Sequence, residues 1–447
     1  MPPNVLFVLT DQMRAHAMGC AGNPDVETPA LDRLAEEGVH VTNAQTTKPM
    51  CSPARGSIVT GQFPHTHRVI YNQLRLPTDG PSMGHAFRNR GYQTGYVGKW
   101  HIDVDEDGPG RVPPGPRRQG FTDWEGFNSG HDYHRGHPRW DGDGQLYWEE
   151  GYQPAVQTDI SLELIERYAA FDAPWLLFLS WGPPHPPFDA PEEYRERYDP
   201  GELELRPNVP ETAEELYGRP GMEKDFDDLR EDLAHYYGLI TSLDDQMERL
   251  LDRLDELGEA EETVVVFTSD HGEMLGSQGR YHKGTPFEEA MNVPLLVRYP
   301  EAVPPATSDA VVSLADLLPT LCSLSGIEAP ETVQGRDVAA HLRGETEGPD
   351  AAYGEDWRVG NADPSQEDYG PWGQPYRVLR TRGHSICVDY TLETQYLFDM
   401  AADPYQTENL AGDPAHADLE AELRDRLFEW AHAVDDNEFM TRQNYIG

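Results

Sequence analysis

Lysine is almost absent from this chain of 447 residues. Its lysines are Lys48, Lys99, Lys224 and Lys283, while acidic residues outnumber basic ones by 79 to 35 and give a formal net charge of -44 at pH 7. The acidic residues are spread along the whole length, which argues against one disordered acidic arm. We expect a halophilic source, where salt screens the self-repulsion, or otherwise an unusually acidic mesophilic protein. Nucleic acid is excluded as a partner, because phosphate binding needs a basic surface.

Cysteine is scarce too, and long apolar runs are missing. The four cysteines, at positions 20, 51, 322 and 387, are widely spaced and suggest no disulfide framework. No apolar run reaches the length of about 18 residues that a membrane-spanning helix needs, so no membrane partner is expected. The N-terminal segment enters a strand at once, without the features of a secretory signal peptide. Together these absences predict a cytoplasmic protein.

Strands and helices alternate along most of the chain. Compact apolar runs predict strands at residues 4–10, 91–101, 174–188, 263–273 and 292–300. Amphipathic patterns predict helices at residues 28–38, 157–170, 224–258 and 314–326, with Thr28 as the cap of the first. This alternation predicts an α/β fold in which helices flank a large, mostly parallel central sheet.

The pattern changes near residue 350. Residues 376–400 are typical of strands joined by turns, and residues 415–433 of a terminal amphipathic helix. We therefore expect a large α/β domain with the active site at 1–350. A smaller domain at 351–447 would be built on an antiparallel sheet and a helix.

Polar residues stand where several predicted strands end. They are Asp11, Gln12, Lys99, His101, His185, Asp270 and His271. In an open α/β sheet, functional groups gather just past the carboxyl ends of the strands, so we expect these side chains at one edge. Two aspartates, an amide and an imidazole suit a divalent cation, which is the simplest way to neutralise buried carboxylates. The alternative is that each aspartate only caps the next helix.

Two of the four lysines lie near the polar residues that follow the predicted strands. Lys99 lies in "GKWH", and Lys283 lies in "YHKGTPFEE". In a chain that has almost eliminated lysine, we expect both to line an anion pocket as point charges. Pairing with surface carboxylates is the alternative.

The segment "KPMCSPARGSIVTG", residues 48–61, places Cys51 at the mouth of a short predicted helix. A plain buried cysteine is one interpretation. However, Cys51 to Arg55 match the pattern Cys-x-Pro-x-Arg, and "GKWH", "PHPPF", "SDHGE" and "LFDMAADPYQTENLA" follow in order. With these motifs the chain resembles, over nearly its whole length, the type I, formylglycine-dependent sulfatases of the alkaline phosphatase superfamily.

The resemblance implies that Cys51 is a precursor that a formylglycine-generating maturation enzyme oxidises to an aldehyde. One hydroxyl of the hydrated aldehyde, activated by the metal, would attack the sulfur of a small-molecule sulfate ester and release the alcohol. The second hydroxyl would then expel sulfate as the aldehyde forms again. The helix N-terminus favours the forming oxyanion. Arg55 would add charge to the pocket or hold Cys51 in place, and it belongs to the pattern that the maturation enzyme reads.

The resemblance also assigns roles to the strand-end residues. The metal ligands would be Asp11, Asp270, His271 and the modified Cys51. The groups that hold the sulfate and protonate the leaving oxygen would be Lys99, His101, His185 and Lys283. Either His101 or His185 would be the acid, because imidazole titrates near neutral pH.

Gln12 departs from the two adjacent aspartates of many sulfatases. Its carbonyl oxygen can still bind the metal, but one negative charge is lost. Calcium is the expected ion, with manganese or zinc as alternatives. With this residue the site also resembles choline sulfatases and the phosphonate or phosphodiester hydrolases that share the formylglycine, so hydrolysis of a phosphonate monoester or phosphodiester is the alternative activity. A non-catalytic anion-binding protein with unmodified Cys51 is a third interpretation.

The segment at 128–140 contains several basic side chains, namely His131, His134, Arg135 and His137. Gly136 and Pro138 disfavour a regular helix there. We expect a loop that contacts the organic part of the substrate, with a second metal site or aromatic packing as alternatives. Cys20, Cys322 and Cys387 are expected to pack as small apolar residues. The sequence leaves the oligomeric state open.

Overall fold

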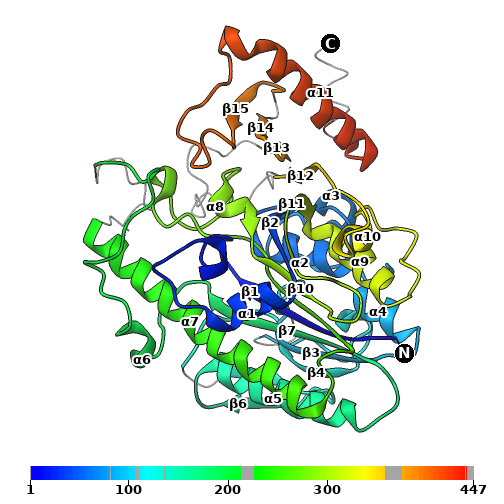
Figure 1. Cartoon of the computed structure of the whole chain (residues 1–447). Coiled ribbons are helices and arrows are strands. Elements are labelled where there is room, and N and C mark those ends of the chain that lie inside the picture. The colour runs from blue at the N-terminus through cyan, green and yellow to red at the C-terminus, as the bar shows by residue number, and fades with distance from the viewer. Residues whose placement is uncertain are drawn as a thin grey trace.

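The computed structural model describes residues 2–80, 82–106, 110–134, 137–212, 226–357, 375–389, 391–437 and 439. Within them the chain forms one large sheet, one small sheet and helices that cover both (Figure 1). The strands are β1 Asn4–Asp11, β2 Val39–Gln45, β3 Gln93–Lys99, β4 Asp123–Phe127, β5 His137–Trp140, β6 Leu146–Glu149, β7 Trp175–Pro184, β8 Thr263–Ser269, β9 Asn292–Val293, β10 Leu295–Arg298, β11 Ala306–Ser313, β12 Ala351–Glu355, β13 Tyr376–Thr381, β14 His384–Asp389 and β15 Thr394–Asp399. The helices are α1 Pro29–Glu37, α2 Cys51–Thr60, α3 Pro64–His67, α4 Met83–Arg88, α5 Gln153–Ala169, α6 Glu192–Arg195, α7 Phe226–Leu257, α8 Glu288–Met291, α9 Leu317–Leu324, α10 Ala339–Leu342 and α11 Ala417–Ala433. Among the described helices, none is both long and apolar enough to cross a membrane.

The large sheet has the strand order β11-β2-β10-β8-β1-β7-β3-β4-β5-β6, and β9 pairs with β2. Its central strands β8, β1, β7, β3 and β4 are parallel to one another. Antiparallel pairing occurs on either side of this centre, where β10 joins β8 to β2 and where β5 and β6 form a hairpin. The prediction of a mostly parallel α/β sheet is confirmed.

The central strand β1 shows why the sheet is covered on both faces. All of its residues are buried, and successive side chains point to opposite faces. Leu6 and Val8 join the apolar cluster that contains Met247 of α7, whereas Phe7 joins the cluster that contains Ile58 of α2. In Figure 1, α5 and α7 run together along one side of the sheet. The continuous apolar run in the sequence is therefore the signature of a strand between two helical layers.

The small sheet has the antiparallel order β12-β13-β14-β15 and carries α11, as predicted. It is joined closely to the rest of the protein. Phe63 lies in the same apolar cluster as residues of the small sheet and α11, and the backbone N–H of Glu355 donates to the carbonyl of Thr47 at 2.8 Å. Lys48 pairs with Asp356 at 2.6 Å. The division at residue 350 remains a prediction, although β12 begins at Ala351.

The cap of α1 differs from the prediction. The Thr28 side chain makes no capping bond; its hydroxyl instead accepts the N–H of Gly19 at 2.8 Å. Asp244, from the middle of α7, accepts the N–H groups of Ala30 at 2.9 Å and Leu31 at 2.8 Å. Each oxygen of the Asp244 carboxylate accepts one of the two N–H groups, while the Thr28 hydroxyl is bonded to Gly19 and Asp32.

Candidate active site

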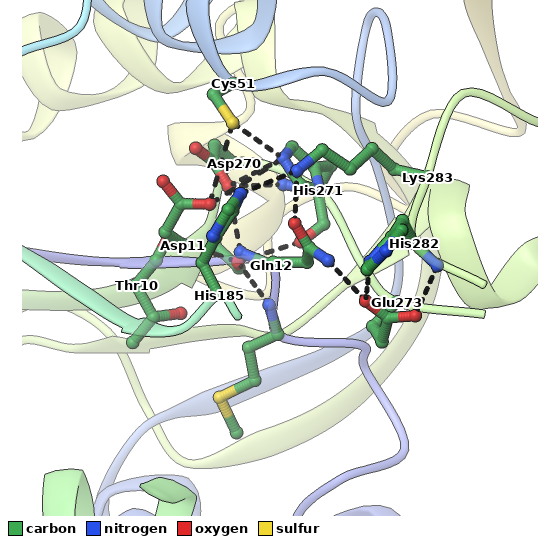
Figure 2. Close-up of polar contacts among 12 residues, drawn as sticks. Thr10, Asp11, Gln12, Cys51, His185, Asp270, His271, Glu273, His282 and Lys283 are labelled. Carbon is green, nitrogen blue, oxygen red and sulfur yellow. Dashed lines mark hydrogen bonds and ion pairs between the residues drawn. The ribbon is translucent and has the colours of Figure 1, made fainter. Parts of the chain in front are cut away.

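The predicted site residues meet at one edge of the large sheet (Figure 2). Asp11 ends β1, Asp270 and His271 follow β8, and His185 follows β7. Cys51 is the first residue of α2. The parallel strands of the centre all end at this edge, which is why residues far apart in sequence converge.

Four of these residues could hold a metal ion. Asp11, Cys51, Asp270 and His271 are all buried, and each offers one ligand atom within 4.8 Å of the others. Cys51 Sγ lies 3.2 Å from His271 Nε2 and 3.7 Å from Asp11 Oδ1. His271 Nδ1 contacts the carbonyl of Gly272 at 3.0 Å, so Nδ1 carries a proton and Nε2 is the nitrogen that faces the cluster. Two carboxylates and one imidazole fit a divalent cation.

Arg55 and Lys99 neutralise the two carboxylates from the other side. Arg55 Nε donates to Asp270 Oδ2 at 2.8 Å, and a second guanidinium nitrogen donates to Asp11 Oδ2 at 3.1 Å. Lys99 Nζ also contacts Asp11 Oδ2, at 2.5 Å. Burial alone would raise the pKa of Asp11, but the charges of Lys99 and Arg55 outweigh it and hold that pKa well below its usual value. The protein therefore supplies counter-charges of its own in addition to any metal ion at the site.

Lys283 binds two other residues of the site. Its Nζ donates to His185 Nε2 at 2.8 Å and to Gln12 Oε1. His185 Nδ1 contacts the carbonyl of Pro186 at 2.6 Å, so the proton is on Nδ1 and Nε2 is an acceptor. Burial and then Lys283 lower the pKa of His185 well below its usual value. An ammonium group has three N–H bonds, and these two contacts use two of them.

His101 lies near Lys99 in an unusual backbone conformation. Its φ angle is 56°, its N–H donates to the carbonyl of Asn128 at 2.8 Å, and its side chain is buried. Burial and then Lys99 lower the pKa of His101 well below its usual value. The lowered pKa of both imidazoles that were expected to act as the acid favours their neutral forms before substrate binds.

Two glycines, in the motifs "GKWH" and "SDHGE", allow backbone segments to approach each other closely at the site. Gly98 has a φ angle of 99°, and a Cβ there would lie 2.0 Å from the carbonyl oxygen of Ser180. A Cβ on Gly272 would lie 1.9 Å from the carbonyl oxygen of Glu289. Both contacts are backbone contacts that cannot relax cheaply, so residues with side chains are excluded at these positions.

His131 and His134, the described histidine side chains of the segment 128–140, have different partners. The His131 ring stacks on the His185 ring with centroids 3.9 Å apart, which places it at the site. His134 Nε2 contacts the carbonyl of Asp189 at 2.6 Å instead. His137 begins β5, and Arg135 lies outside the described residues.

Three contacting residues were missed from the sequence. The Ser180 hydroxyl accepts a hydrogen bond from Arg55 at 2.8 Å, and the Tyr133 hydroxyl donates to the carbonyl of His185 at 2.7 Å. Glu273 accepts a hydrogen bond from the Gln12 amide. Glu273 stands in "SDHGE" and could have been noticed there, whereas Ser180 and Tyr133 carry no local signal.

Comparisons with known proteins match nearly the whole chain. Residues 3–327 match the family model described as Sulfatase, and residues 276–433 match the model described as N-sulphoglucosamine sulphohydrolase, C-terminal. The ulvan-active sulfatase of Formosa agariphila is 36% identical over 99% of this chain and 84% of its own length.

Solved structures agree as well. One from work on the metabolism of multiple glycosaminoglycans by Bacteroides thetaiotaomicron has a TM-score of 0.85 at 26% identity, covering 99% of this chain and 98% of that one. The phosphonate monoester hydrolase of Agrobacterium radiobacter has a TM-score of 0.80 at 25% identity, covering 97% and 96%. The matches show an enzyme that hydrolyses sulfate esters, and the chain belongs to the sulfatase family.

Proposed function

We propose that this sulfatase hydrolyses sulfate esters of saccharides through a formylglycine made from Cys51. The observation that carries the proposal is the position of Cys51 Sγ at the first residue of α2, 3.2 Å from His271 Nε2 and 3.7 Å from Asp11 Oδ1. An oxygen nucleophile at this position would lie among the candidate metal ligands. The saccharide is supported by the ulvan-active relative and by an endo-4-O-sulfatase of Bacteroides thetaiotaomicron that is 29% identical over 91% of this chain and 88% of its own length.

Asp11, Asp270, His271 and residue 51 would hold one divalent cation, and calcium is our first choice over manganese or zinc. The amide oxygen of Gln12 has a second lone pair, so it can be a further ligand while it accepts from Lys283. When bound, the cation would polarise the oxygen nucleophile and offset the charge of the sulfate.

Lysine and histidine side chains of the site would bind the sulfate group and protonate the leaving oxygen. Lys99 and Lys283 place positive charge against the sulfate oxygens, which holds the ester and stabilises the charge that develops at sulfur. As the bond between sulfur and the alcohol oxygen breaks, that oxygen takes a proton from an imidazole, either His185 or His101. The lowered pKa of both favours the neutral imidazole in the free site. A bound anion raises the pKa of a nearby imidazole, so substrate binding would favour the protonated form that donates the proton.

The competing activity is phosphonate monoester hydrolysis, which Gln12 and the likeness to a phosphonate monoester hydrolase favour. Kinetics on a matched aryl sulfate and aryl phosphonate monoester would separate the two. We expect kcat/KM to be higher for the sulfate by about 100-fold or more. The reverse preference would overturn the assignment.

The assay should run from low to molar KCl, because a net charge of -44 leads us to propose a halophilic enzyme whose activity rises with salt.

Removal of divalent cations is expected to abolish turnover and lower the melting temperature. The Oδ1 atoms of Asp11 and Asp270 lie 3.8 and 3.6 Å from His271 Nε2, so a cation bound beside them would reduce the repulsion between the two carboxylates. A cation that binds only the folded state adds about 4 kcal/mol to the free energy of unfolding when its free concentration is 1,000 times Kd. Dialysis against EDTA, followed by separate additions of Ca²⁺, Mn²⁺ and Zn²⁺, measures both effects. Full activity in the chelated enzyme would contradict the metal site.

A further inference from the structure

Gln12 is held in one orientation at the centre of the site. Its φ angle of 71° lies in the left-handed region, which is unusual for glutamine. The backbone N–H donates to Asp270 Oδ1 at 3.1 Å, and the carbonyl accepts from the Tyr236 hydroxyl at 2.9 Å. The side-chain amide donates from Nε2 to Glu273 Oε2 and accepts at Oε1 from Lys283. Donor and acceptor are therefore assigned at both ends of the amide.

Glu273 is itself fixed by the loop that carries Lys283. It is fully buried, and its Oε1 accepts the N–H of Leu275 at 2.9 Å and the N–H of His282 at 2.5 Å. His282 is the residue directly before Lys283. Figure 2 shows Glu273 between the Gln12 amide and His282. One carboxylate thus contacts both the backbone next to Lys283 and the amide that accepts its ammonium group.

We propose that Glu273 is a positioning residue for the sulfate-binding Lys283, acting through Gln12. The order of hydrogen bonds runs from the Lys283 ammonium to the Gln12 oxygen, and from the Gln12 amide nitrogen to the Glu273 carboxylate. The carboxylate accepts only, so it forces the amide oxygen toward Lys283. It also places a negative charge next to Gln12, where a second aspartate would otherwise carry one. The inference rests on the proposed role of Lys283 in binding sulfate.

The variant Glu273→Gln tests this relation with almost no change of volume. The oxygen of the new amide should stay with the two backbone N–H donors, Leu275 and His282, so its NH₂ group would face the NH₂ of Gln12 and force the Gln12 amide to turn. Lys283 then loses its acceptor and shifts. We expect kcat/KM to fall by about 10–100-fold, the range seen when a supporting hydrogen bond around a site is removed. The stabilisation of the protein by inorganic sulfate, measured as a rise in melting temperature, should weaken in parallel.

The double variant Gln12→Glu with Glu273→Gln exchanges the two groups. The amide at 273 can then donate to the carboxylate at 12, and that carboxylate accepts from Lys283, so the order of hydrogen bonds returns. We expect this exchange to recover at least about tenfold of the lost kcat/KM and much of the sulfate-dependent stabilisation, as a double-mutant cycle with strong coupling would. Gln12→Glu alone sets two carboxylates against each other, so we expect this single variant to lack the wild-type kcat/KM and the wild-type stabilisation by sulfate.

Glu355→Gln is the matched control. Glu355, the last residue of β12 in the small sheet, is equally buried. It accepts the backbone N–H of His65 at 2.7 Å and contacts the His65 ring at 2.6 Å. Its loss should lower the melting temperature without changing the response to sulfate. If Glu273→Gln behaves like this control, or if the exchange recovers nothing, the proposal is wrong. An inactive wild type would count against the proposed function, while sulfate binding would still decide the role of Glu273.

Discussion

Replacement of Cys51 by alanine is expected to lower kcat/KM by about 10⁴-fold or more while the fold remains intact, because the variant lacks the atom from which the nucleophile is made. Cys51 is 1% exposed and begins α2. Alanine suits a helix and removes only the sulfur, so the loss of packing is small. Steady-state kinetics on an aryl sulfate, with a thermal melt, measures both parts of the prediction.

Cys322→Ala is the control for loss of a buried sulfur. Cys322 lies in α9, within the apolar cluster on the α2 side of the sheet, and its pKa is raised by burial to about 12. This variant should melt slightly earlier and keep wild-type kinetics. The mass of the peptide around residue 51 in the active wild type gives an independent check. An unmodified thiol in fully active protein, or a Cys51→Ala variant with most of its activity, would rule out the formylglycine route.

The arrangement of the sheet could be predicted because burial leaves a strong mark on sequence. A strand covered on both faces must be apolar throughout, as β1 and β8 are, and polar residues directly after such strands lie at a known edge. That reasoning predicted that Asp11 and Asp270, which are far apart in sequence, lie close together. It could not reveal which charge each carboxylate pairs with, because side-chain partners depend on distances of a few ångströms between strands.

The remaining differences have the same cause. Asp244 caps α1 from α7, a helix about 200 residues away in sequence, and no local pattern around Thr28 reveals it. The role of Glu273 depends on the loop back to His282. Segment 128–140 has too little periodicity to place its basic side chains, and only the structure separates His131 from His134.

Arg55→Lys is expected to be the most damaging conservative substitution in the site. The guanidinium spans Asp11 and Asp270 at once and also donates to the carbonyl of Lys99 and the hydroxyl of Ser180, both at 2.8 Å. A lysine carries the same charge on one nitrogen, which cannot reach all four acceptors. We expect a loss of about 3 kcal/mol in the free energy of unfolding and a fall of about 100-fold or more in kcat/KM.

The measurements must separate geometry from maturation, because Arg55 also lies in the pattern that the maturation enzyme is expected to read. Chemical denaturation reports stability whatever residue 51 has become, and the mass of the peptide around residue 51 reports maturation. Arg33→Lys is the control, since Arg33 pairs with Glu37 and Asp255 on the surface, where such pairs contribute little. If Arg55→Lys unfolds like Arg33→Lys, then Lys99 and the backbone N–H groups at Asp270 suffice to hold the carboxylates. If it is less stable and added divalent cation restores part of the loss, Arg55 and the cation share the task of balancing the same two charges from opposite sides.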